Sequence, residues 1–139
     1  MIILDTNVVS EPLRGAPDGR VVDWLDAQSI DTLYLTTITV GELRYGVAAM
    51  PPGRRRDGLR HALDEVVETQ FAERVIPYGI DATTHYARLM SDARARGRAI
   101  GTADGMIAAI AASMGFTVAS RDIAPFEAAG VPVVDPWGR

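Results

Sequence analysis

The sequence contains no cysteine and no lysine, and all 14 of its basic residues are arginine. Without cysteine, the protein cannot form disulfides, use a catalytic thiolate or bind zinc through sulfur. Without lysine, mechanisms that need a Schiff base or a phosphate-binding lysine are excluded, although arginine can still hold a phosphate through two parallel hydrogen bonds. The two histidines, His61 and His85, are too few for a histidine zinc site. Any metal would therefore be bound through oxygen ligands.

The chain of 139 residues carries a formal net charge of −4. This charge argues against general binding of nucleic acid over a positive surface. The longest apolar stretch, residues 106–112, is well short of the ~20 residues that span a membrane. We therefore expect a single domain over residues 1–139 that is soluble and cytoplasmic, without a targeting or membrane segment. The arginines at 54–60 and at 94–98 are typical of solvated helix faces and a helix C-terminus.

Short apolar runs alternate with longer helical patterns along the chain. Strands are expected at residues 1–4, 33–36, 75–76, 116–119 and 133–134, and helices include 38–50, 54–70, 81–96, 102–114 and 123–129. This alternation predicts a three-layer α/β/α fold with a central, mostly parallel sheet of about five short strands. The helix at 38–50 is apolar on nearly every side, which predicts that it is buried. Four aromatic residues are spaced as core residues: Trp24, Tyr45, Tyr86 and Phe126.

Four acidic residues lie next to apolar runs. Asp5 follows the first strand, Asp122 follows the fourth, Glu42 lies in the helix after the second strand, and Asp104 lies in the first turn of the helix at 102–114. Because the carboxyl ends of parallel strands meet at one edge of a sheet, we expect these four side chains to converge there. Four carboxylates drawn together repel one another unless a cation holds them. The pattern therefore predicts a metal site.

A cluster of carboxylates without histidine or cysteine suits Mg²⁺ or Mn²⁺. Mg²⁺ keeps several waters and takes ligands from substrate phosphates, which points to phosphodiester chemistry with one metal, or with two metals ~4 Å apart. The hydroxyls of Thr6 and Ser120 and the amide of Asn7 are candidates for orienting the carboxylates or a water. Arg121, next to Asp122, is a candidate for contacting substrate phosphate.

Each acid taken alone also has a structural interpretation. Asp5, Asp104 and Asp122 each fit a helix cap or a first-turn acid, and Glu42 fits an ion pair with Arg44 or a more distant arginine. The predicted convergence of all four favours a site, because a purely structural arrangement would gain nothing from their repulsion. Phosphoryl transfer through Asp5, as in dehalogenase-like phosphatases or receiver domains, fits poorly because both rely on a lysine.

The ordered motifs of this chain resemble those of the PIN-domain ribonucleases. The residues that carry the resemblance are Ile3-Leu4-Asp5-Thr6-Asn7-Val8-Val9-Ser10, Thr39-Val40-Gly41-Glu42-Leu43, Asp104-Gly105-Met106-Ile107-Ala108-Ala109 and Ser120-Arg121-Asp122. Within that family the chain is most similar to the VapC-type toxins of bacterial type II toxin–antitoxin pairs, especially the FitB-like branch. The resemblance covers essentially the whole chain.

The resemblance implies a metal-binding quartet of Asp5, Glu42, Asp104 and Asp122, assisted by Thr6, Asn7 and Ser120. The fourth position varies between Asp and Asn in this family. The resemblance also implies an endoribonuclease that depends on Mg²⁺ or Mn²⁺ and cleaves single-stranded or loop RNA. It further implies a homodimer that is inhibited by an antitoxin, with higher-order assembly of the two. An alternative interpretation is a catalytically silent PIN module that binds RNA or a protein partner.

Overall fold

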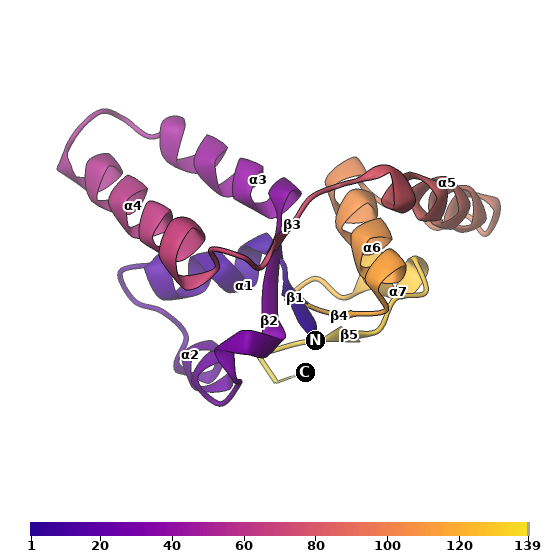
Figure 1. Cartoon of the computed structure of the whole chain (residues 1–139), viewed down its shortest axis with the longest axis horizontal. Helices are drawn as coiled ribbons and strands as arrows, with labels where there is room; N and C mark the ends of the chain where they lie inside the picture. Colours follow the sequence, from indigo (N-terminus) through magenta and orange to yellow (C-terminus); the bar gives the residue numbers. More distant parts are fainter. Residues whose placement is uncertain (139) are drawn as a thin grey trace.

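The computed structural model describes residues 1–138 and contains a parallel sheet of five strands (Figure 1). The strands are β1 (Ile2–Leu4), β2 (Leu33–Thr36), β3 (Val75–Ile76), β4 (Thr117–Ala119) and β5 (Val133–Val134). They lie in the order β3-β2-β1-β4-β5, and every neighbouring pair is parallel. The last residue of the predicted 1–139 domain lies outside the described residues.

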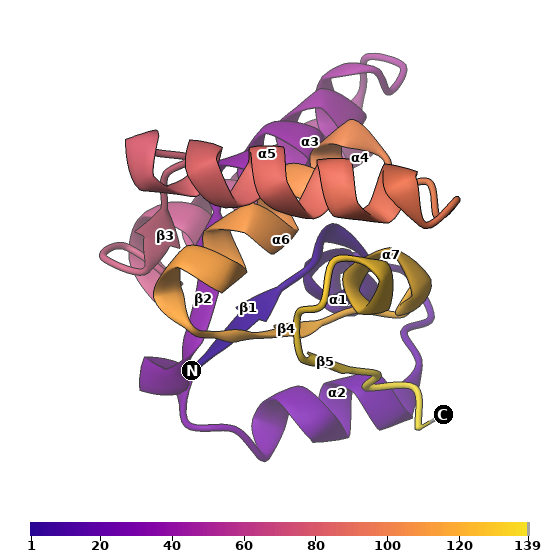
Figure 2. The same cartoon turned by 90° about the vertical axis from the view of Figure 1, so that its right-hand side faces the viewer.

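Helices cover both faces of the sheet, as the two views show (Figures 1 and 2). The α-helices within residues 1–138 are α1 (Thr6–Ser10), α2 (Gly19–Asp26), α3 (Thr37–Ala48), α4 (Arg54–Glu65), α5 (Ile80–Ala95), α6 (Thr102–Met114) and α7 (Ala124–Ala128). A π-helical segment, Val66–Gln70, extends α4, and short 3-10 turns at Glu11–Leu13 and Ile30–Thr32 complete the helical structure. Helices α5, α6 and α7 lie on one side of the sheet, and α1, α2 and α4 lie on the other.

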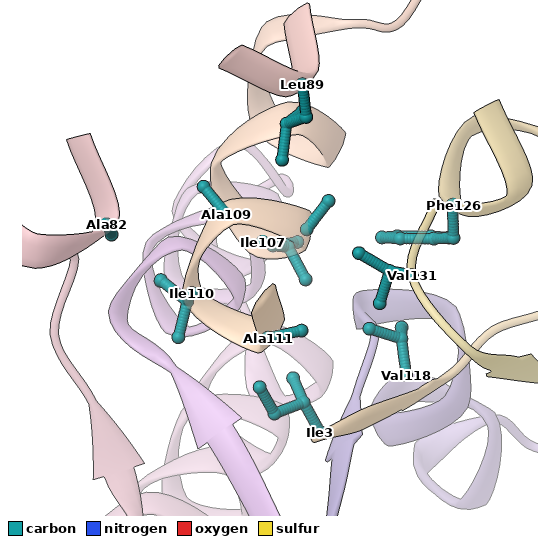
Figure 3. Close-up of a cluster of buried hydrophobic side chains, with 11 residues drawn as sticks. Ile3, Ala82, Leu89, Ile107, Ala109, Ile110, Ala111, Val118, Phe126 and Val131 are labelled. Carbon is teal, nitrogen blue, oxygen red and sulfur yellow. The ribbon is translucent and has the colours of Figure 1, made fainter. Parts of the chain in front are cut away.

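Successive residues of the central strand β1 point to opposite faces of the sheet, and helices cover both faces. Ile3 is fully buried among residues of α5, α6 and α7, whereas Leu4 packs with residues of α1, α2 and α4. The Ile3 cluster includes Ile107 from α6 and Phe126 from α7 (Figure 3). A strand that is apolar on both faces therefore joins two separate halves of the core.

The predicted three-layer α/β/α fold with a parallel sheet is confirmed. Three predicted strands, 33–36, 75–76 and 133–134, and the helix at 102–114 have the expected bounds, and the other predicted strands and helices differ by a few residues at their ends. Helix α6 begins directly after Gly101 and ends at Met114. The next residue, Gly115, has a φ of 69°, in the left-handed region that glycine adopts readily, and it caps the helix. These local signals were sufficient to place the helix that carries Asp104.

The prediction that the helix at 38–50 is buried is wrong. Within α3, Thr39 and Leu43 are buried, but Tyr45 is 76% exposed, so its assignment to the core is also wrong. Helix α3 lies at the end of the sheet and packs against α1 and α4, so only one side of it is covered (Figure 1). An apolar sequence by itself does not show how many sides of a helix find a partner.

Within residues 1–138, no helix combines the length and the apolar character that crossing a membrane would require.

Candidate metal and active site

The register of the parallel sheet places Asp5 beside Ser120. Leu4 of β1 pairs with Ala119 of β4, so the next residue of each strand emerges at the same carboxyl edge. The backbone N–H of Asp5 donates to the carbonyl of Ala119 at 2.9 Å, which continues the ladder by one step. The side-chain hydroxyl of Ser120 then donates to Oδ2 of Asp5 at 2.7 Å. This contact joins the ends of two neighbouring strands.

The Asp5 carboxylate is held in one orientation. Its Oδ1 accepts a hydrogen bond from the backbone N–H of Thr6 at 2.8 Å, so Asp5 also caps helix α1. Burial raises the pKa of Asp5 above its usual value, the hydrogen bonds from Ser120 and Thr6 oppose that rise, and the nearby charges of Glu42 and Asp122 add to it. Asp5 is thus both a helix cap and a member of an acidic group.

Glu42 reaches the same edge from α3. Its Oε1 accepts a hydrogen bond of 2.7 Å from the hydroxyl of Thr6, the residue that follows Asp5. The prediction that the helix at 38–50 is buried fails at Glu42 as well, since its side chain is exposed. An ion pair between Glu42 and Arg44 does not form, because Arg44 pairs with Asp64 at 2.7 Å instead. Glu42 is therefore turned toward Asp5 rather than toward the arginine on its own helix.

Asp104 lies in the first turn of α6 and is half-buried. Its pKa is raised to about 6, first by burial and then by the negative charges of Asp5, Asp122 and Glu42. Asp104 is therefore close enough to the other three carboxylates for their charges to act on it. The expected convergence at the carboxyl edge of the sheet is therefore seen in the electrostatics of Asp104.

Asp122 follows β4 and is exposed. Its backbone N–H donates to the hydroxyl oxygen of Ser120 at 3.1 Å, which fixes the turn after the strand. Asn7 contributes to the same turn, because its Nδ2 donates to Ser120 Oγ at 3.4 Å and its Oδ1 accepts from the Arg121 N–H at 3.1 Å. Ser120 and Asn7 thus connect the segments that carry Asp5 and Asp122.

The side chain of Arg121 extends toward the C-terminal segment. Its guanidinium carbon lies 5.3 Å from the centre of the Trp137 ring, a cation–π contact. Its charge also contributes to the lowered pKa of Asp18, although the main cause there is the hydrogen bond from Arg20. The role of Arg121 in binding phosphate stays a prediction.

The donor set fits a hard divalent cation in its chemistry. All four side chains are carboxylates, and burial together with the charges of the other three raises the pKa of Asp104. A bound cation would offset this cost of keeping Asp104 ionised. Within residues 1–138, however, no three acidic or histidine side chains are yet arranged closely enough to surround an ion. Hydrogen bonds from Thr6 and Ser120 hold Glu42 and Asp5 in place. The predicted quartet is brought to one edge but does not enclose an ion.

Two cavities flank the acidic group. A cavity of about 460 Å³ is lined by Asp104 and Asp122 together with Arg98. A second cavity, of about 310 Å³, is lined by Thr6 and Glu42 and continues along apolar side chains of α3 and α4. Both volumes fall within or close to the range of small-ligand sites. The carboxylates are therefore accessible from both sides.

Removing the charge of Asp104 should stabilise the metal-free protein. A folded-state pKa of about 6, above its usual value of 3.8, means that the group's contribution to stability is fully present below pH 3.8 and is lost as the pH rises through 6. In EDTA, Asp104→Asn should therefore match the wild type near pH 4 and exceed it by roughly 1 kcal/mol at pH 7.5, after allowance for solvent screening. Urea unfolding at several pH values measures this difference.

The exposed Asp31→Asn variant controls for the loss of one negative charge at the opposite edge of the sheet. A gain in stability for Asp104→Asn that is equal at every pH would show that the substitution acts through something other than this charge.

Two residues near the site were missed by sequence reasoning. Thr39 is fully buried, and its hydroxyl lies 3.5 Å from that of Thr6, so it supports the Thr6–Glu42 contact. Its position three residues before Glu42, on the same face of the helix, was a usable signal. Arg98 lines the cavity of Asp104 and Asp122, whereas its cluster was interpreted as a solvated helix end. Only the turn between α5 and α6 brings it there.

A family model described as "PIN domain" matches residues 2–131 of the chain. Three curated relatives are similar over nearly their whole length. "Plasmid stability protein StbB" of Pseudomonas syringae pv. tomato is 55% identical, covering 99% of both chains. "VapC ribonuclease Y4jK" of Sinorhizobium fredii is 53% identical over 99% of this chain and 98% of its own. "Toxin FitB" of Neisseria gonorrhoeae is 45% identical over 99% of both.

A solved structure has nearly the same backbone. "Crystal Structure of FitAcB from Neisseria gonorrhoeae" superimposes with a TM-score of 0.95 at 45% identity and covers 99% of both chains. The similarity therefore extends through the sheet, the helices on both faces and the acidic edge.

Proposed function

The chain belongs to the PIN domain family, and from that premise we propose that it is a metal-dependent endoribonuclease that acts as the toxin of a toxin–antitoxin pair. The observation that carries this proposal is the gathering of Asp5, Glu42, Asp104 and Asp122 at the carboxyl edge of the sheet, where they share one electrostatic field. The names of two relatives, a VapC ribonuclease and a toxin, support the activity and the biological role.

Asp5, Glu42, Asp104 and Asp122 are the residues that would hold the cofactor, which we propose to be Mg²⁺ or Mn²⁺ because all the ligands are oxygen atoms. When bound, such an ion activates water and neutralises charge on the phosphodiester. Asp5 supplies the most fixed carboxylate, because Ser120 and the Thr6 backbone hold both of its oxygens. The carboxyl of Asp104, with its pKa of about 6, must lose its proton before it can act as a ligand.

Thr6, Asn7 and Ser120 act as positioning residues in this scheme. Thr6 contacts both carboxylates at the start of the chain's first helix, through its N–H to Asp5 and its hydroxyl to Glu42. Ser120 joins Asp5 to the turn that carries Asp122. Such contacts fix the ligands in one geometry, so the ion and the substrate meet a prepared set of oxygens.

The proposed partners are an RNA substrate, an antitoxin protein and a second copy of the chain, in the cytoplasm. The net charge of −4 suits a basic antitoxin segment. Exposed apolar side chains, including Ile80 at the start of α5 and Met114 at the end of α6, provide surface that a partner protein or a second copy would cover.

Removing divalent metal should abolish cleavage. Purified protein incubated with a panel of tRNAs and structured RNAs should cleave in Mn²⁺ or Mg²⁺ and lose at least about 100-fold of its rate in EDTA, since an ion in this role is worth several kcal/mol. Adding Mn²⁺ back should restore the rate. Cleavage that is undiminished in EDTA would contradict the metal, and failure to cleave any RNA with either ion would favour a silent PIN module.

A further inference from the structure

Two cavities share Arg98 and Ala99 as lining residues, in the turn between α5 and α6. The first, of about 460 Å³, also contains Asp104 and Asp122. The second, of about 590 Å³, continues away from the carboxylates. Its other lining residues are Met90, Ser91, Arg94, Gly97 and Ile100. Arg98 therefore lines both the cavity of two candidate metal ligands and a second, larger cavity.

The turn fixes the backbone of Arg98. Helix α5 ends at Ala95, Gly97 has a φ of 71°, and the Arg98 N–H donates to the carbonyl of Ala93 at 2.9 Å. This arrangement is a common glycine-containing helix end, in which the chain reverses sharply. Helices α5 and α6 lie side by side, so the turn is held at both ends (Figure 2). A fixed backbone with an exposed side chain is suited to binding a ligand.

The arginines of this turn differ in what they contact. The guanidinium of Arg96 donates to the carbonyl of Ala128 at 2.9 Å, so Arg96 holds the turn against α7. Arg94 and Arg98 are exposed and form no ion pair with any acid in residues 1–138. Since the chain has no lysine, phosphate contacts must be made by arginines such as these.

We propose that Arg98, with Arg94 behind it, binds a phosphate next to the scissile one, and that the chamber of about 590 Å³ holds the attached unpaired nucleotide. This proposal rests on the ribonuclease function proposed above and adds to it a subsite for the phosphate and nucleotide next to the cleavage site. The half-buried side chains of Met90 and Ile100 offer an apolar surface to a base. A base inside a duplex stays stacked in its helix and would not enter such a chamber.

RNA fits this surface better than an acidic peptide does. An acidic peptide bound to Arg98 would place its carboxylates next to Asp104 and Asp122, with nothing to offset the repulsion. An RNA chain places its scissile phosphate where the carboxylates hold a cation and its neighbouring phosphate at the guanidinium. The acids and the arginine that line the same cavity therefore match two neighbouring phosphates of an RNA backbone.

Binding of RNA to an inactive protein tests the proposal. The background is Asp5→Asn, and the probe is a fluorescein-labelled single-stranded RNA of about 12 nucleotides, followed by anisotropy in Mg²⁺ at several salt concentrations. Adding Arg98→Ala should weaken binding about 10-fold and reduce the slope of log affinity against log salt by about one, because one phosphate contact is lost. Arg98→Gln should behave similarly.

The matched control is Arg88→Ala, which removes an arginine from α5, the helix that leads into the turn of Arg98. Arg88 is exposed and lines a different cavity, where its guanidinium contacts His85 at 3.1 Å. It should change the affinity for single-stranded RNA less than two-fold. A blunt RNA duplex of the same sequence should bind more weakly than the single strand and should be little affected by Arg98→Ala.

The outcomes distinguish failure of the Arg98 subsite from failure of the proposed ribonuclease function. Equal affinity with and without Arg98, in a protein whose wild type cleaves RNA, would overturn the subsite and leave the ribonuclease standing. An equal loss for single strand and duplex would overturn the assignment of an unpaired nucleotide. No RNA binding by the Asp5→Asn protein together with no cleavage by the wild type would overturn both.

Discussion

Replacing Asp5 with Asn should reduce RNA cleavage by at least about 1,000-fold, equivalent to about 4 kcal/mol of transition-state stabilisation. The substitution keeps the size of the side chain but removes the negative charge at the centre of the acidic group. It also disturbs the contact with the Ser120 hydroxyl, which donates to Oδ2 of Asp5. Initial rates on an RNA that the wild type cleaves, measured at saturating Mn²⁺, give the size of the loss.

The companion variants assign the roles of the other acids. Asp104→Asn should lose activity to a similar extent, because Asp104 shares the field of Asp5, Glu42 and Asp122. Asp122→Asn should lose less, because the side chain of Asp122 is exposed. Asp31→Asn, at the opposite edge of the sheet, should retain the wild-type rate.

Circular dichroism and thermal unfolding should show that all these variants keep their fold. An Asp5→Asn protein that is folded and cleaves RNA at the wild-type rate would remove the proposed metal site.

The second large effect concerns stability. Phe126→Ala should destabilise the protein by about 3–5 kcal/mol, the usual cost of emptying a buried aromatic site. Phe126 is fully buried in α7 and lies beside Val131 in the cluster that joins α6 to the sheet (Figure 3). Because typical domains have only about 5–15 kcal/mol of stability, this loss is a large part of the total. Urea unfolding followed by far-UV circular dichroism measures it.

The control for Phe126→Ala is Tyr45→Ala, which removes an aromatic side chain that is 76% exposed on α3. It should change stability by no more than about 0.5 kcal/mol. Where Phe126→Ala does not fold, Phe126→Leu gives a smaller and measurable loss in the same direction, about 1 kcal/mol. Equal losses at positions 126 and 45 would contradict the burial of both residues.

Much of the fold was predictable because the chain marks its own elements. The run before Asp5 is continuously apolar, as a strand buried on two faces must be, and Ile3 and Leu4 do face opposite halves of the core. Gly115 ends α6 where the sequence indicated. The burial of helix α3 was predicted wrongly because its sequence is rich in apolar residues, like that of α6. Of these two helices, α6 lies on the face of the sheet and α3 does not.

The sequence was sufficient to predict at which edge of the sheet the candidate site lies. Asp5 and Asp122 follow strands, and parallel strands end together, so their proximity follows from the alternation of strands and helices. The contacts between these segments were not predictable in detail. The hydrogen bond from Thr6 to Glu42 depends on the angle at which α3 leaves the sheet, and the buried position of Ser120 depends on the register of β1 with β4.

The sequence by itself determined the chemistry that the protein can perform, because it provides carboxylates and arginines and offers neither cysteine nor lysine. It also determined the elements, through apolar periodicity and glycine at helix ends. Only the tertiary structure decided which groups meet. The pKa of Asp104 rises to about 6 because distant segments bring three other charges near it, and Arg98 reaches the same cavity because α5 and α6 pack side by side. Which side chains lie close together depends on how the helices and strands pack, and local sequence patterns do not reveal that packing.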